Sequence, residues 1–154
     1  PNGAGKTTLI RLSNRISRPD KGTLLIDGHA MTDADVREIG HLPEERGLYA
    51  KKEVFEQLVY LAELKGVKKK EAMSSVDNWL RRLGVQEYRN RKLETLSKGN
   101  QQKIQFITAL AHDPDILILD EPYAGLDTQG CRIIDKLILD YVNQGRAVVM
   151  TRHV

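Results

Sequence analysis

The apolar positions of the chain follow a helical period in five segments. Before Gly84, for example, Val76, Trp79, Leu80 and Leu83 stand at i, i+3, i+4 and i+7, which is the spacing of one helix face. Glycines follow three of these segments, as expected of a residue that often ends helices. The expected helices span residues 7–16, 52–65, 76–83, 98–111 and 133–142.

Four short apolar runs predict strands. Thr23 to Ile26 ends at the turn pair Asp27-Gly28, and Ile39 to Leu42 is followed by a proline. The runs Ile116 to Leu119 and Ala147 to Met150 are apolar at every position. Such runs are typical of strands that a parallel sheet buries on both faces, and we expect both to be buried.

Strands and helices alternate at both ends of the chain, whereas the middle is helical. This order favours an α/β core of about residues 1–49 and 101–154, with a helical subdomain of about residues 50–100 inserted into it. The 154 residues, 40% apolar and 29% charged, fit one globular domain. The longest apolar runs have four residues, whereas a membrane helix needs roughly 20. A lone cysteine, Cys131, excludes an internal disulfide and a multi-cysteine metal site.

A glycine-rich stretch opens the chain directly before the first expected helix. Gly5, Lys6 and Thr7 match the last three fixed positions of the phosphate-binding pattern G-x-x-x-x-G-K-[ST], and the first glycine would precede Pro1. Backbone N–H groups of such a loop surround phosphate oxygens, the lysine reaches the β- and γ-phosphates, and the threonine hydroxyl holds Mg²⁺. The alternative is a glycine turn with a chance Gly-Lys-Thr. The candidate ATP-binding residues are Asn2, Gly3, Ala4, Gly5, Lys6, Thr7 and Thr8.

Two carboxylates end the expected strand at Leu119. Asp120 stands where a phosphate-loop ATPase binds Mg²⁺ through water, and Glu121 could polarise the attacking water as a general base. A lone Asp-Glu pair in a turn is weak evidence. A Gly-Lys-Thr loop followed by a buried strand that ends in Asp-Glu strongly indicates ATP hydrolysis with Mg²⁺.

A third motif, Leu96-Ser97-Lys98-Gly99-Asn100, identifies the family. The chain resembles the ATP-binding domain of ABC transporters, whose signature is LSGGQ followed by a helix. Leu96, Ser97 and Gly99 match, while Lys98 replaces a Gly and Asn100 replaces the Gln. In that family the signature contacts the γ-phosphate of ATP bound to the other subunit. A serine that caps a helix start is the plainer interpretation, and it is compatible with the first.

Three further stretches extend the resemblance. His153, after the last expected strand, corresponds to the family's switch histidine, which contacts the γ-phosphate. Glu44 stands where the family's Q-loop has a Gln, and it could hold a water or Mg²⁺. The surrounding Pro-Glu-Glu-Arg-Gly-Leu-Tyr is similar to the exporter branch that includes sodium-extrusion ATPases. The family's D-loop, usually S-G-L-D, corresponds to Ala124, Gly125, Leu126 and Asp127.

The resemblance implies a phosphate-loop NTPase (RecA-like) core that is truncated at its N-terminus. It further implies an ATPase that uses Mg²⁺, with Thr7, Asp120 and Glu44 as candidate metal ligands. Two subunits, identical or different, would enclose ATP between them, and permease subunits would attach them to the inner, cytoplasmic face of a membrane. Residues that stack on adenine, and a central strand that feeds the phosphate loop, would precede Pro1. Without that strand the runs at 116–119 and 147–150 lack a neighbour, so we expect the isolated fragment to be weak or inactive. The transported substrate cannot be inferred.

Two other functions remain open. A soluble ABC-type ATPase of translation carries two such domains in one chain, whereas the DNA-repair type carries a long coiled coil, and no sustained heptads separate Lys6 from Ser97. A scaffold without hydrolysis would commonly lack Glu121. The basic run formed by Lys65 and Lys68 to Lys70 is expected to be solvated surface, and no nucleic acid is expected as a partner.

Overall fold

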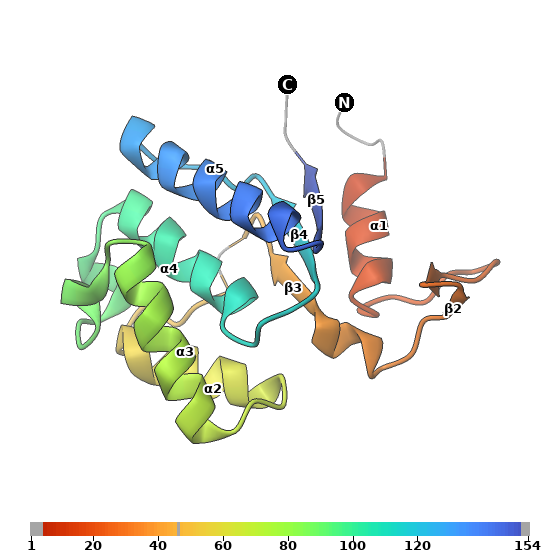
Figure 1. The fold of residues 1–154 in the computed structure, drawn as a ribbon, viewed down its shortest axis with the longest axis horizontal. Coiled ribbons are helices and arrows are strands. Elements are labelled where there is room, and N and C mark those ends of the chain that lie inside the picture. Colours follow the sequence, from red (N-terminus) through yellow and green to blue (C-terminus); the bar gives the residue numbers. More distant parts are fainter. Residues whose placement is uncertain (1–4, 46, 152–154) are drawn as a thin grey trace.

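The computed structural model describes residues 5–45 and 47–151, which fold around a parallel sheet with helices on both sides (Figure 1). The helices are α1 (Lys6–Ser13), α2 (Val54–Leu64), α3 (Lys69–Arg82), α4 (Lys98–Leu110) and α5 (Thr128–Asn143). The strands are β1 (Leu25–Ile26), β2 (His29–Ala30), β3 (Ile39–Leu42), β4 (Ile116–Asp120) and β5 (Ala147–Thr151). Three 3₁₀ helices, η1 (Asp35–Glu38), η2 (Gln86–Tyr88) and η3 (Leu93–Thr95), lie between them.

The main sheet has the order β3-β4-β5, and all of its strands are parallel. Leu42 pairs with Leu119, and Asp120 pairs with Thr151. The chain crosses from β3 to β4 through α2, α3 and α4, and from β4 to β5 through α5. Because the strands are parallel, their carboxyl ends meet at one edge of the sheet, which is where ligands bind in open α/β sheets.

Each face of the sheet packs against different helices. Leu117 and Leu119 belong to the large apolar cluster that includes α4 and α5, whereas Ile118 packs with Ile39 and with Ile10 of α1. The approach of α4 to β3 is especially close at Gly40, where an added Cβ would stand 2.1 Å from the carbonyl oxygen of Ala109. Only glycine fits there, and this contact fixes α4 on the sheet.

The helical middle of the chain forms its own layered packing. Helices α2 and α3 pack on each other and on α4 (Figure 1). The buried side chains of α2 and α3 recur at the spacing that the sequence predicted, and they include Val54, Leu58, Ala62, Ala72, Val76, Trp79 and Leu80. The helices expected at 52–65, 76–83 and 98–111 are therefore confirmed, with α3 starting earlier than its apolar stripe.

One expectation about a strand is wrong. The run Ala147 to Met150 forms β5, but it is not buried, since Val149 is 50% and Met150 is 45% exposed. In the described part of the chain β5 pairs with β4 only, so one of its edges has no neighbouring strand. The strand expected near Thr23 is confirmed as β1, which ends at Asp27-Gly28. Asp27 and Gly28, with φ of 47° and 81°, form a hairpin turn that leads into the antiparallel strand β2.

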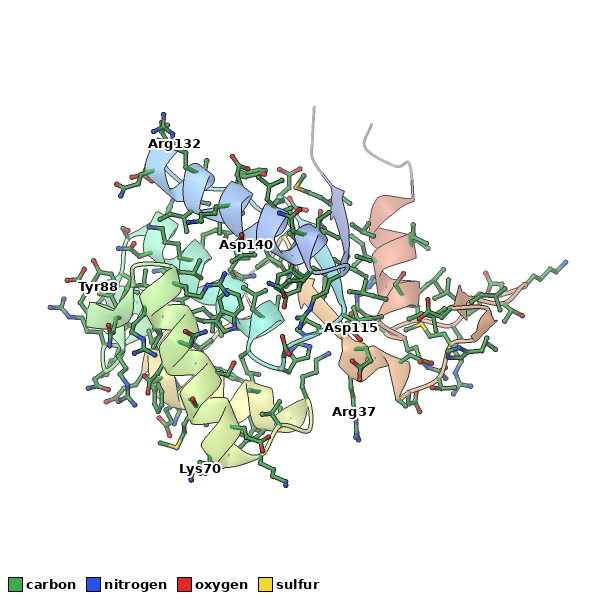
Figure 2. All side chains as sticks on the ribbon, in the orientation of Figure 1. Arg37, Lys70, Tyr88, Asp115, Arg132 and Asp140 are labelled. Carbon is green, nitrogen blue, oxygen red and sulfur yellow. The ribbon has the colours of Figure 1, made fainter. Side chains whose placement is uncertain are left out.

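Charged side chains extend outward from the helices on most sides of the molecule, as those of Lys70 and Arg132 do (Figure 2). Lys68, Lys69 and Lys70 are exposed, as the sequence analysis expected. In the two described stretches, no helix combines the length and the apolar character that a membrane crossing requires.

Candidate nucleotide-binding site

Three sequence-predicted carboxylates follow adjacent strands at one edge of the sheet. Glu44 comes two residues after β3, Asp120 ends β4, and Glu121 follows it. Asp120 and Glu121 are half-buried, whereas Glu44 is exposed. The structure therefore places all three at the edge where the parallel topology predicts a ligand.

The end of β5 contributes a residue that the sequence analysis missed. The Thr151 hydroxyl donates a hydrogen bond to the Asp120 carboxylate, and the Thr151 carbonyl accepts one from the Glu121 backbone N–H at 3.3 Å. Both contacts follow from the register, which pairs Asp120 with Thr151. A polar residue directly after the apolar run at 147–150 was the available signal.

The backbone of Glu121 has the left-handed conformation, with φ of 48°. This conformation costs a non-glycine residue about 1–2 kcal/mol, and such strain is concentrated at functional sites. The left-handed conformation breaks the alternation of side chains along β4. Glu121 therefore projects in a direction that extended backbone would not give it. The strain therefore coincides with the residue that the sequence predicts as general base.

The N-terminal end of α1 points to the same side of the molecule as the carboxyl end of β5 (Figure 1). Gly5 caps α1 in the left-handed conformation, with φ of 82°, and no side chain caps the helix. A helix start without a side-chain cap leaves backbone N–H donors and a partial positive charge for an anion. Thr8 is exposed in the first turn. The candidate residues Asn2, Gly3 and Ala4 lie outside the described residues, as do the side chains of Lys6 and Thr7.

The signature residues lie on the other side of the molecule from α1, where α4 and α5 begin (Figure 1). Ser97 caps α4, and its hydroxyl accepts a hydrogen bond from the Asn100 backbone N–H at 3.3 Å. Ser97 and Lys98 are exposed, Gly99 and Asn100 are half-buried, and Leu96 is buried at 7% exposure. The structure therefore separates the signature from this chain's own α1, as expected if the signature contacts a nucleotide on another subunit.

The candidate D-loop contacts the signature directly. A Cβ on Gly99 would stand 2.9 Å from the Gly125 carbonyl oxygen. Asp127 caps α5 by accepting a hydrogen bond from the Gly130 backbone N–H at 2.7 Å, so this carboxylate has a structural role as well. Ala124 and Gly125 are exposed, and Leu126 is half-buried. His153 lies outside the described residues.

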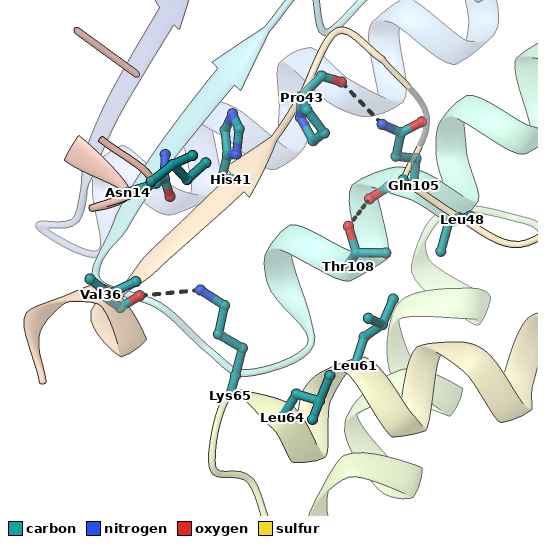
Figure 3. A pocket seen from close by; sticks show the side chains of 12 residues that line it. Asn14, Val36, His41, Pro43, Leu48, Leu61, Leu64, Lys65, Gln105 and Thr108 are labelled. Atoms are coloured by element: carbon teal, nitrogen blue, oxygen red, sulfur yellow. Dashed lines mark hydrogen bonds between the residues drawn. The ribbon is translucent and has the colours of Figure 1, made fainter. Parts of the chain in front are cut away.

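Two buried glutamines of α4 were also missed. Gln105 donates through Nε2 to the carbonyl oxygens of Pro43 at 3.0 Å and Glu45 at 3.3 Å, on either side of Glu44 (Figure 3). Gln102 donates through Nε2 to the carbonyl oxygen of Pro122 at 3.4 Å. No local pattern indicates these contacts, because their partners come from distant segments of the chain.

A cavity of about 410 Å³ lies beside β3, between α1, α2 and α4 (Figure 3). Lys65 lines it, and its ammonium donates to the carbonyl oxygens of Val36 at 3.2 Å and Ile39 at 3.3 Å. Burial lowers the pKa of Lys65. The expectation that Lys65 is solvated surface is therefore wrong. Burial also lowers the pKa of His41 in the same cavity, although nearby Asp120 opposes that shift.

The side chains at this edge of the sheet suit a magnesium ion that takes most of its ligands from phosphate and water. In residues 5–45 and 47–151, no three side chains of His, Cys, Asp or Glu come together as a metal cage. Mg²⁺ is typically bound through one or two carboxylates together with substrate phosphates and water. Asp120, half-buried beside the Thr151 hydroxyl, fits that mode of binding.

Comparison with known proteins identifies the family of the chain. The ABC transporter family matches residues 1–124, and the chain belongs to this family. It is 45% identical over 99% of its length to the ABC transporter ATP-binding protein YhaQ of Bacillus subtilis (strain 168). It is 35% identical over 97% of its length to the tungstate uptake system ATP-binding protein TupC of Peptoclostridium acidaminophilum, of which it covers 69%.

The fold is also that of the family. A solved structure of the ATP-binding subunit of an ABC transporter superposes on the whole chain with a TM-score of 0.87 at 25% identity, and the chain covers 65% of that structure. The expected α/β fold of a phosphate-loop ATPase is thereby confirmed. The chain spans 51% of YhaQ, or about half of that relative's length.

Proposed function

We propose that the full-length protein binds and hydrolyses ATP as the motor subunit of an ABC-type membrane transporter. One observation carries this proposal: the uncapped start of α1 and the carboxylates Asp120 and Glu121 lie at the same edge of the sheet in a chain of this family. The first supplies donors for phosphate, and the second supplies a metal ligand and a base.

Each candidate residue has a proposed part in that reaction. Residues 2–8 bind the phosphates, and Thr7 and Asp120 hold Mg²⁺, which neutralises charge on the phosphates. Glu121 orients the attacking water and accepts its proton. His153 contacts the γ-phosphate. Exposed Glu44 holds a water or the metal from the side of β3.

A second ATP-binding subunit completes the site in this proposal. The signature, residues 96–100, begins α4 on the side of the molecule away from α1. It can therefore serve a nucleotide held by the other subunit, while the D-loop, residues 124–127, crosses between the two. Ser97, the Gly99 backbone and the start of α4 are the donors offered to that nucleotide.

Membrane attachment is proposed to occur through permease subunits at the cytoplasmic face. The loop after β3, which carries Glu44, would contact the permease as well as the nucleotide. We further propose a division into an α/β core, about residues 1–49 and 101–154, and a helical subdomain, about residues 50–100. The name of TupC states uptake of tungstate, whereas the sequence around Glu44 resembles an exporter branch, so the substrate and its direction stay open.

The test measures Mg²⁺-dependent phosphate release by the full-length protein, with and without its permease. Glu121→Gln keeps the shape of the side chain and removes the base, so turnover should fall about 10²-fold. ATP binding and an ATP-dependent dimer, followed by size-exclusion chromatography, should persist. Glu71→Gln, an exposed residue of α3, is the control. Turnover of the Glu121 variant within twofold of wild type would contradict the assignment of the base.

A further inference from the structure

Helix α4 carries two buried glutamines one turn apart. Gln102 is 6% and Gln105 is 2% exposed, and in the described residues Gln57 is the one other amide side chain that is as buried. A buried amide costs free energy unless it is hydrogen-bonded, so buried glutamines need identified partners. We call Gln102 and Gln105 the positioning pair.

The partners of the positioning pair are backbone carbonyls of the two loops that carry the candidate carboxylates. Gln105 bonds the carbonyls of Pro43 and Glu45, which flank Glu44. Gln102 bonds the carbonyl of Pro122, the residue after Glu121. Each glutamine therefore holds the backbone directly beside a candidate carboxylate.

The helix that presents this pair is itself held at both ends. At its start, Gly99 lies against the Gly125 backbone, and near its end Ala109 lies against Gly40 of β3. Residues 99, 102, 105 and 109 are three or four positions apart and share one face of a helix. Along this face α4 contacts, in order, the D-loop, the loop of Glu121, the loop of Glu44 and the sheet.

We propose that Gln102 and Gln105 are positioning residues that set where Glu121 and Glu44 stand relative to the nucleotide at this chain's own site. This inference rests on the proposed function. Because α4 begins with the signature, a displacement of the signature by the other subunit's nucleotide moves both loops through these hydrogen bonds. A misplacement of about 1 Å at such loops is enough to slow a reaction strongly.

The test compares Gln105→Met with Gln57→Met in the full-length protein. Methionine has a similar volume and cannot donate these hydrogen bonds. Gln57 is the matched control, because it is 4% exposed and bonds backbone groups of Tyr49 and Lys52, in the segment just before α2. We expect Gln105→Met to lower kcat about tenfold, because the loop of Glu44 loses both hydrogen bonds that hold it in place, with KM for ATP within about twofold. Gln57→Met should leave kcat within about twofold while lowering the unfolding midpoint similarly.

A double-mutant cycle with Glu44→Gln shows whether Gln105 acts through Glu44. If it does, the double variant loses less kcat than the product of the two single losses. If the two residues act independently, the double variant loses the full product. Gln102→Met is the second variant and should also lower kcat, so a folding failure of Gln105→Met does not end the test. Equal kcat losses in the Gln57 and Gln105 variants, or multiplicative losses with Glu44→Gln, overturn the inference. Absence of turnover in the wild-type protein instead refutes the proposed function, and the inference with it.

Discussion

The backbones of Gly99 and Gly125 lie against each other, so the candidate signature of one chain packs directly on the candidate D-loop of the same chain. Gly99→Ala would place a Cβ 2.9 Å from the Gly125 carbonyl oxygen, and one of the two backbones must shift. The atom that must shift belongs to the backbone, so the shift costs free energy, and the preference of a helix for alanine over glycine, about 1 kcal/mol, offsets part of that cost. We therefore expect unfolding free energy to change by about 1 kcal/mol or less, while ATP turnover of the full-length protein falls.

Thermal unfolding of the same variant is the control for that measurement. Unchanged turnover together with an unchanged unfolding midpoint would show that the contact between Gly99 and Gly125 has no part in hydrolysis.

The close contact between Gly40 of β3 and Ala109 of α4 matters for stability. Gly40→Ala would place a Cβ 2.1 Å from the Ala109 carbonyl oxygen and 2.8 Å from the Leu117 side chain. Because the nearer atom belongs to a helix backbone, side-chain movement cannot relieve the clash, and we expect a loss of about 3 kcal/mol in unfolding free energy. Urea unfolding measures it. Gly47→Ala is the matched control, since no described atom lies within 4 Å of the added Cβ; equal midpoints for the two variants would contradict the packing described for α4.

The backbone conformation of Glu121 makes a prediction that is independent of its carboxylate. Glu121→Gly and Glu121→Ala both remove the side chain, so they differ mainly in how well they tolerate φ of 48°. Glycine adopts this conformation without strain, and we expect its variant to be more stable by about 1 kcal/mol, the reverse of the usual order of these residues. Chemical unfolding of both variants measures the difference. An alanine variant at least as stable as the glycine variant would show that residue 121 is not strained.

His112 predicts how stability depends on pH. Burial lowers its pKa from 6.5 to about 4, and Lys65 adds to the shift, although the Ile39 carbonyl and Asp113 oppose it. Its Nε2 lies 3.1 Å from the Ile39 carbonyl oxygen. The folded state therefore holds His112 neutral while the unfolded state binds a proton below pH 6.5, so stability falls as pH drops from 6.5 towards 4. The full shift corresponds to about 3 kcal/mol.

His112→Gln can keep a donor to Ile39 and cannot titrate, so unfolding free energy of this variant should depend less on pH in that window. Some dependence should remain, because burial lowers the pKa of His41 in the same direction. Parallel pH profiles for wild type and His112→Gln would contradict this role.

Sequence patterns predicted those parts of the structure that local chemistry decides. The strand at Ile39–Leu42 and the helices α2 and α4 follow directly from apolar spacing and from the glycines and prolines after them. The apolar run of β5 alone predicted burial, whereas its exposure follows from the outer edge of β5, which no strand of the described residues covers. The hairpin at Asp27-Gly28 was predictable, since that pair favours a two-residue turn.

The residues of the candidate site likewise divide into those that local sequence predicted and those that it did not. Asp120 and Glu121 were found because they end a strand that is apolar throughout, and the parallel register then brings Thr151 beside them. Gln105 lies in a helix between Ile104 and Phe106, and nothing local distinguishes it from an exposed glutamine. Its partners are about 60 positions away in the sequence and become neighbours only when α4 packs on β3.

The outer edge of β5 has a consequence for handling the 154-residue chain alone. Its N–H and C=O groups have no strand to pair with in the described structure, and Val149 and Met150 are about half exposed beside them. An apolar strand edge of this kind is a template for another chain. Two copies of the isolated chain should therefore pair edge to edge and aggregate as concentration rises, and a charged residue placed at Val149 should keep them apart.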